Sequence, residues 1–259
     1  MTTVPIFEAL EPGIWRATAF ARGPFAGVHG GSVAGLMAAA IEAAAGAASG
    51  ARALSLRADF LRPTPVGVPL VLGVTPVQVG RRLLLLDATV VAEGRLTARC
   101  SMTLATEMEV TALAEDFCTE TPPPPPDPES LPRRAGTATH RGPWIMDVLQ
   151  GRLAPDGAVW FRWTVPLLPG GVSPFVAALG PADFAHGLAR PGQPGPSPVP
   201  AFPNSDLSVQ FDRAPRGEWI GVRPFTRWRR QGLGIGYGDL LDLDGAFGRV
   251  GMGVVLVPA

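Results

Sequence analysis

Residues 29–38 have the sequence HGGSVAGLMA, in which a pair of glycines stands directly before a run of helical composition. Residues 31–48 are rich in alanine and contain no proline, so we expect one helix there. Glycines permit a close approach to the backbone, and the free N–H groups at the start of a helix attract negative charge. The stretch therefore predicts a helix whose first turn can hold a developing oxyanion.

Strand-like runs surround this helix on both sides. The breaks between them read RPTPVGVP, GRR and EG, which is the composition of turns. A short turn containing glycine joins the second and third of the runs that follow the helix, which predicts an antiparallel hairpin. We expect one strand before the helix and four after it, at residues 7–20, 54–61, 70–79, 83–92 and 96–105.

The same order of elements recurs in the second part of the chain. Residues 173–190 form the second expected helix, with Ser173 as its N-cap and Pro174 at its first position. The motif Phe60-x-Arg62 is echoed there by Phe211-x-Arg213. The strands expected around this helix are residues 158–167, 206–213, 218–227, 234–241 and 247–257. One strand, one helix and four strands, twice over, indicate a duplicated α+β unit.

A proline tract separates the two units. Residues 121–132 read TPPPPPDPESLP, and consecutive prolines favour an extended linker because they cannot donate to a sheet. We therefore expect an N-terminal unit at residues 1–118, a linker at 119–135 and a C-terminal unit at 136–259. Each sheet buries one face on its helix, so two units can pair edge to edge. A substrate cleft is expected at their seam.

The composition excludes several classes of function. Basic and acidic residues number 22 each, so the chain carries no net charge that indicates nucleic acid or an anionic membrane as a partner. The apolar stretch at residues 33–48 is too short to span a bilayer, and no secretory signal is apparent, so we expect a cytoplasmic protein. Three histidines and two cysteines, all scattered, do not form a metal site.

With the element order and the HGG motif in view, the chain resembles acyl-CoA thioesterase II and its relatives in the hotdog superfamily. The resemblance implies a double hotdog: two antiparallel sheets, each wrapped round a long central helix, paired into a continuous sheet. It implies hydrolysis of an acyl-CoA to a free acid and coenzyme A. Apart from the coenzyme A of the substrate it implies no cofactor. A homo-oligomer such as a dimer is compatible with it.

The resemblance also assigns roles to residues. Single-hotdog thioesterases carry a carboxylate in the helix after HGG, but that position is Ala38 here, and Glu42 lies one turn further on. In thioesterase II a helix aspartate of the second half is catalytic, and the segment LGPADFAH supplies Asp183. Gly30 and Gly31 would then hold the oxyanion, and Asp183 would activate water or attack the thioester directly.

Further residues complete the expected site. The position of a water-orienting hydroxyl falls on Asn204, with Ser205 beside it, and His29 and Ser32 lie at the helix entry. The position of a glutamine in the last strand falls on Gly251. Tyr237 or Gln231 on the preceding strand could compensate for the missing glutamine.

Two alternative functions stay open. A non-catalytic acyl-thioester-binding protein is favoured by Gly251, which has no side chain to orient water. A hotdog hydratase or dehydratase is suggested by Asp183 and His186, although hydratases of the MaoC type space this pair as Asp-x4-His. The alternating glycines at residues 232–238 predict a strand with one face free of side chains, against which another element packs closely.

Overall fold

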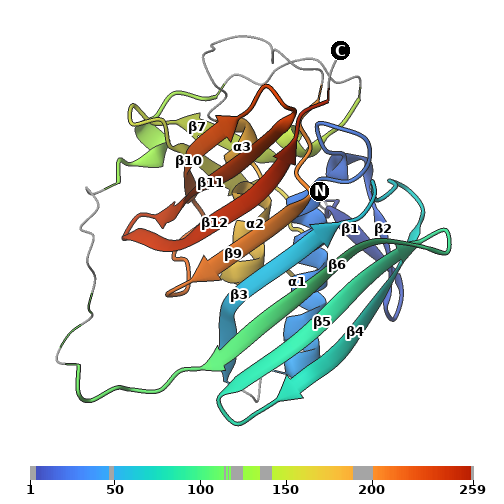
Figure 1. The fold of residues 1–259 in the computed structure, drawn as a ribbon, viewed down its shortest axis with the longest axis horizontal. Coiled ribbons are helices and arrows are strands. Elements are labelled where there is room, and N and C mark those ends of the chain that lie inside the picture. Colours follow the sequence, from blue (N-terminus) through green and yellow to red (C-terminus); the bar gives the residue numbers. More distant parts are fainter. Residues whose placement is uncertain are drawn as a thin grey trace.

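A computed structural model describes residues 4–46, 50–113, 115, 117, 125–134, 142–188 and 201–257. Within these residues, twelve strands form one continuous antiparallel sheet (Figure 1). From one edge to the other the order is β1 (Phe7–Glu11), β2 (Ile14–Ala17), β4 (Pro69–Val79), β5 (Leu83–Ala92), β6 (Arg95–Thr106), β3 (Ala51–Phe60), β9 (Asp206–Phe211), β12 (Gly245–Val255), β11 (Leu233–Asp242), β10 (Ile220–Trp228), β8 (Val159–Trp163) and β7 (Leu149–Leu153).

The sheet consists of two units of equal topology that meet at strands β3 and β9. Counted outward from this seam, one side reads β3, β6, β5, β4, β2, β1 and the other reads β9, β12, β11, β10, β8, β7. The seam is an antiparallel ladder that runs from the pair Ser55 and Gln210 to the pair Asp59 and Asp206. The expected double hotdog, with its two sheets joined into one, is confirmed.

The helices lie together on one face of the sheet (Figure 1). Helix α1 (Gly30–Ala45) packs on β3 to β6 and α3 (Ala185–Leu188) packs on β10 to β12, while α2 (Pro174–Ala182) lies between them against α1. Small residues let the helices approach closely. A Cβ on Gly35 would lie 2.7 Å from Leu167 Cδ2 and 3.6 Å from Val176 Cγ1. No helix in the described part of the chain is long and apolar enough to cross a membrane.

The second unit does not contain the single long helix expected at residues 173–190. Pro181 has no N–H, so the carbonyl of Ala177 instead accepts a hydrogen bond from Trp163 Nε1 at 2.9 Å. The chain then forms a tighter turn, because the Phe184 N–H donates to the carbonyl of Pro181, three residues earlier, at 3.1 Å. The helix therefore ends at Ala182, and Asp183 stands at its C-cap.

The other differences from the expected elements are small. The first strand is two strands, β1 and β2, joined by a turn in which Gly13 has a φ of 75°. Strand β7 was not expected from the sequence. Residues 119–124 and 135 of the expected linker lie outside the described residues, whereas Arg133 forms a bridge with Arg152 of β7. Short 3-10 turns occur at η1 (Ala19–Ala21), η3 (Pro128–Ser130) and η4 (Ile145–Asp147).

Candidate active site

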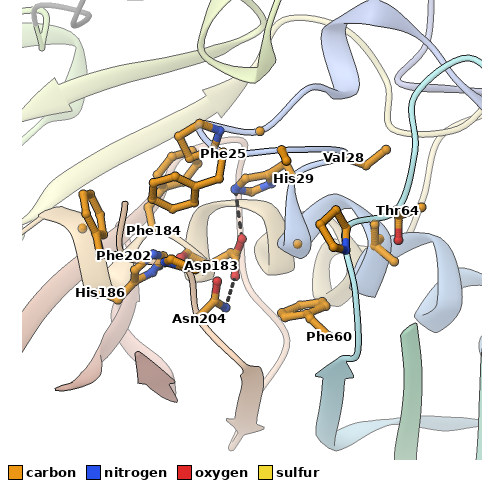
Figure 2. A pocket seen from close by; sticks show the side chains of 18 of the residues that line it. Phe25, Val28, His29, Phe60, Thr64, Asp183, Phe184, His186, Phe202 and Asn204 are labelled. Atoms are coloured by element: carbon orange, nitrogen blue, oxygen red, sulfur yellow. Dashed lines mark hydrogen bonds and ion pairs between the residues drawn. The ribbon is translucent and has the colours of Figure 1, made fainter. Parts of the chain in front are cut away.

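The first turn of α1 meets the break between α2 and α3 (Figure 2). The Gly31 N–H donates to Asp183 Oδ2 at 2.9 Å, and only 3% of the Asp183 surface is exposed. A Cβ on Gly31 would lie 2.7 Å from Asp183 Cβ and would also collide with the Leu179 carbonyl. Glycine is therefore required for the helix start to reach the carboxylate.

The Asp183 carboxylate has further polar partners that fix its position. Asn204 Nδ2 donates to Asp183 Oδ1 at 2.8 Å and to the Asp206 carbonyl at 3.0 Å. These two bonds fix which end of the amide faces the acid. Asn204 lines the cavity described below, and its Oδ1 has no donor among the described residues. That oxygen can therefore accept a hydrogen bond from a water molecule beside the acid.

His29 covers the other side of the carboxylate. Its Nε2 lies 3.2 Å from Asp183 Oδ2, although the two are not aligned as a hydrogen bond. Its Nδ1 lies 3.3 Å from the buried Ser32 hydroxyl, and its ring stacks on Phe184 at 4.7 Å between centroids. Burial lowers the pKa of His29, although the negative charge of Asp183 opposes that shift. The imidazole is therefore neutral near pH 7.

The two glycines of the motif have different surroundings. Gly31 uses its N–H on Asp183, whereas the Gly30 N–H has no acceptor among the described residues. A Cβ on Gly30 would lie 2.9 Å from Phe60 Cζ and 3.1 Å from Asp183 Oδ2. Of the two glycines expected to offer an N–H to the oxyanion, Gly31 already uses its N–H on Asp183, so Gly30 remains the candidate donor.

The site opens into a cavity of about 480 Å³, which is within the size range of small-molecule pockets. Its wall contains Gly30, His29, Asp183 and Asn204 together with residues that sequence reasoning did not assign to the site: Phe25, Phe60, Arg62, Arg134, Phe184 and Phe202. Phe60 and Arg62 come from one motif and Phe184 follows Asp183 directly, but Phe25, Arg134 and Phe202 come from separate loops, so no local spacing connects the whole set.

Four predicted site residues are not in the cavity wall: Gly31, Ser32, Tyr237 and Gly251. Gly31 and Ser32 lie behind the wall and contact Asp183 and His29, whereas Tyr237 and Gly251 have other surroundings. Tyr237 stacks on Phe225 at 5.3 Å and its hydroxyl accepts a hydrogen bond from Arg227 Nη2 at 3.1 Å. Gly251 is the cross-strand partner of Tyr237, so a side chain there would share its face of the sheet. A Cβ on Gly251 would meet nothing within 4 Å, whereas its neighbours Val250 and Met252 are buried. The assignments of Tyr237 and Gly251 were wrong, because the alternation of the strands directs these positions away from Asp183.

Three other predicted residues have altered or weaker roles. The Ser205 hydroxyl bonds to Asp206 Oδ1 at 3.0 Å, although the residue borders the cavity. Glu42 does not approach the glycines; its Oε1 accepts a hydrogen bond from the Ser173 hydroxyl at 2.8 Å. His186 bonds through Nδ1 to the backbone carbonyl of Asp183 at 2.8 Å, not to its carboxylate.

The strand with alternating glycines does carry a closely packed element, as expected. A Cβ on Gly236 would lie 2.5 Å from His186 Cα, so α3 rests directly on β11. No cluster of three or more His, Cys, Asp or Glu side chains suited to a metal occurs among the residues the structure describes. The site thus combines a buried carboxylate, a free helix N–H and an apolar cavity, which suits the addition of water to an activated carbonyl.

Comparisons with known proteins agree with this architecture. The family described as acyl-CoA thioesterase N-terminal domain matches residues 21–108, and the one described as acyl-CoA thioesterase C-terminal domain matches residues 115–250. Among proteins with curated functions, no sequence matches the chain.

Solved structures share the fold over almost the whole chain. A protein assigned as a thioesterase from Novosphingobium aromaticivorans has a TM-score of 0.74 at 19% identity, with 98% of this chain and 99% of that chain covered. Acyl-CoA thioesterase II TesB2 from Mycobacterium marinum has a TM-score of 0.70 at 18% identity, with 98% and 96% covered. A hot dog protein of unknown function from Alicyclobacillus acidocaldarius has a TM-score of 0.69 at 18% identity, with 97% and 96% covered.

Proposed function

Because the chain belongs to the acyl-CoA thioesterase family, whose N-terminal and C-terminal domains it carries in order, we propose that it hydrolyses an acyl-CoA to a free acid and coenzyme A. The single observation that carries the proposal is the buried Asp183 carboxylate held by Gly31 and Asn204 at the wall of an apolar cavity. A fixed carboxylate in such a place can take a proton from water without having to reorganise.

The proposed reaction has two steps. Asp183 takes a proton from a water molecule that Asn204 Oδ1 helps to orient, and the oxygen adds to the thioester carbonyl. The Gly30 N–H and the dipole of α1 stabilise the oxyanion that forms. The oxyanion then collapses, the carbon–sulfur bond breaks, and the proton held by Asp183 passes to the departing thiolate.

Direct attack by Asp183 on the thioester is the second form of this chemistry. It would give a mixed anhydride and a free thiolate, and water would then cleave the anhydride. Single-turnover hydrolysis in heavy-oxygen water detects an anhydride that water cleaves at its Asp183 carbonyl. If water attacks the thioester, the label enters the product acid in the first turnover. If water attacks the enzyme carbonyl of an anhydride, the label stays on Asp183.

The cavity suggests where the parts of the substrate bind. Phe25, Phe184 and Phe202 supply an apolar wall suited to an acyl group. Arg62 is exposed and borders the same cavity, so we assign it to the phosphates of coenzyme A. The predicted binding-protein alternative rested on the glycine at position 251. That argument fails because a side chain there would not face Asp183.

One observation favours a second candidate function. His29 Nε2 lies 3.2 Å from the Asp183 carboxylate, and an acid–histidine pair at the end of a hotdog helix could also add water to an enoyl-CoA. The other predicted pair, Asp183 and His186, is joined through the backbone carbonyl of Asp183 and not through its carboxylate. A hydratase would therefore use His29.

Release of free thiol from saturated acyl-CoAs tests the proposal. We expect Asp183→Asn to lower kcat by about 100-fold or more. Asp59→Asn is the control, because Asp59 is a strand carboxylate that pairs with Arg57 and Arg99 instead of facing the site. Loss of enoyl absorbance without thiol would show a hydratase, and acyl-CoA binding without either reaction would show a binding protein. An Asp183→Asn variant with the wild-type rate would contradict the proposal.

A further inference from the structure

His186, which borders the cavity, has an unused hydrogen-bond acceptor. It lies in α3, is 5% exposed and forms part of the cavity wall. Its Nδ1 lies 2.8 Å from the backbone carbonyl of Asp183, and because a carbonyl can only accept, Nδ1 carries the proton. Nε2 is therefore an acceptor. It is buried and has no partner among the described residues.

The imidazole is held in this orientation from several sides. Gly236 of β11 allows the His186 backbone to lie against the strand, where a Cβ would come within 2.5 Å of His186 Cα. The Thr226 hydroxyl lies 3.3 Å from the Ala185 carbonyl and 3.4 Å from that of His186. Burial lowers the pKa of His186, although Asp183 opposes that shift, so the ring is neutral and its acceptor persists near pH 7.

The surroundings of Nε2 are aromatic. The imidazole meets Phe202 edge to face at 5.7 Å, and Phe202 meets Phe25 in the same way at 5.0 Å (Figure 2). A buried acceptor without a donor destabilises the protein, and most such groups in folded proteins have a partner. A polar group fixed in an otherwise apolar wall is the arrangement by which binding sites select a polar substituent.

We propose that His186 Nε2 accepts a hydrogen bond from a hydroxyl on the acyl group, and that the preferred substrates are hydroxyacyl-CoAs. The inference rests on the proposed thioesterase function, because it places the acyl group in the cavity beside Asp183. His186 follows Asp183 by three residues and bonds to its backbone, so the hydroxyl lies close to the thioester carbon, at the α, β or γ position. His186 is a specificity-determining residue and takes no part in the bond changes.

Two substitutions separate the acceptor from the structural bond. Asparagine can place an amide N–H where Nδ1 stands, so His186→Asn retains a donor to the Asp183 carbonyl but has no atom at the position of Nε2. Glutamine reaches the position of Nε2, so His186→Gln retains an acceptor there. Tyr237→Phe removes a hydroxyl that lies outside the cavity wall and leaves His186 in place, which makes it the control.

Binding is measured with thioether analogues of butyryl-CoA and of α-, β- and γ-hydroxybutyryl-CoA, in which a methylene replaces the reacting carbonyl. Calorimetry gives the Kd of each analogue without any reaction. We expect wild type and Tyr237→Phe to bind one hydroxylated analogue roughly tenfold more tightly than the plain one. His186→Gln should keep most of this preference, and His186→Asn should lose it. Circular dichroism checks that each variant is folded.

Equal affinity of wild type for all four analogues would overturn the inference, and so would a hydroxyl preference that persists in His186→Asn. The outcome is separate from that of the proposed function. Hydrolysis of butyryl-CoA without any hydroxyl preference would leave the thioesterase and remove the role of His186. A hydroxyl preference in binding, without thiol release from any acyl-CoA, would keep the role of His186 and remove the thioesterase.

Discussion

The Gly31 N–H and the Asp183 carboxylate form a buried 2.9 Å hydrogen bond between residues 152 positions apart. Gly31 belongs to the first unit and Asp183 to the second, so neither unit alone contains the site. The reverse contact between the two helices is of a different kind. Ser173, which caps α2, donates to Glu42 of α1 at 2.8 Å, and Pro174 at the start of α2 has no N–H to offer an oxyanion. The two contacts between the helices therefore differ: one holds the carboxylate that we propose to be catalytic, and the other is a structural contact.

The first prediction concerns the close approach at Gly31. In Gly31→Ala the new Cβ would lie 2.7 Å from Asp183 Cβ and 3.0 Å from Gly180 Cα, so the helices must separate. We expect a loss of about 1–3 kcal/mol in the free energy of unfolding by urea and a loss of thiol release. Gly251→Ala is the control, because its Cβ meets nothing within 4 Å and its φ is not positive. A Gly31→Ala variant as stable and active as wild type would show that the approach is not tight.

The second prediction concerns the structural contact. The Ser173 hydroxyl accepts a hydrogen bond from the Val176 N–H at 3.2 Å and donates to Glu42, whose carboxyl pKa is raised by burial. Ser173→Ala removes both bonds, so we expect it to lower the free energy of unfolding by about 1–2 kcal/mol. Ser173→Thr keeps the hydroxyl and should restore most of the stability. Equal destabilisation by both variants would show that packing, not the hydroxyl, is responsible.

Much of the fold could be predicted from the sequence because each unit has strong local signals. Alanines mark α1, and turn residues separate β4, β5 and β6. The break in the second helix was missed because Pro181 could have kinked the helix without ending it. At Pro181 the carbonyl of Ala177 loses its helical N–H partner and accepts a hydrogen bond from Trp163 of β8 instead. This contact with a distant strand could not be predicted from the local sequence.

The candidate site was only partly predictable for a different reason. The HGG motif was found from the local pattern of a helix start, and Asp183 from the resemblance to thioesterase II, although the helix end beside Asp183 was not predicted. The assignments of Tyr237 and Gly251 depended on the register of strands, and a shift of one residue moves a side chain to the other face of a sheet. The cavity wall depends on loops from both units, so Phe25 and Phe202 meet only after the units have docked.

The third prediction concerns Asn204. Asn204→Ala removes the donor to Asp183 Oδ1, and we expect kcat to fall about 10- to 100-fold with a smaller change in KM. Ser205→Ala is the control, because that hydroxyl bonds to Asp206 instead of Asp183. Equal losses in both variants would show that the whole segment, and not the Asn204 amide, supports the reaction.

Asn204→Asp gives a fourth prediction, which is read from the pH dependence of kcat. The new carboxylate would stand about 2.8 Å from that of Asp183. Two carboxylates at this distance cannot both be ionised easily, so the fully ionised form of the pair is reached only at higher pH. A general base must be ionised, and the rise of activity with pH should therefore move to higher pH. An unchanged profile in an active variant would show that Asp183 is not the base that limits the rate.

The fifth prediction concerns stability and pH. Burial lowers the pKa values of both His29 and His186 from 6.5 in the folded protein. Below pH 6.5 the unfolded chain therefore binds protons that the folded chain does not, and stability must fall as the pH decreases through that range. Each histidine contributes a slope of up to about 1.4 kcal/mol per pH unit. Urea unfolding between about pH 5 and 8 measures this slope. His29→Gln and His186→Asn should each reduce the slope by up to about 1.4 kcal/mol per pH unit, which corresponds to one proton. A slope that neither variant changes would mean that these histidines are protonated in the folded protein.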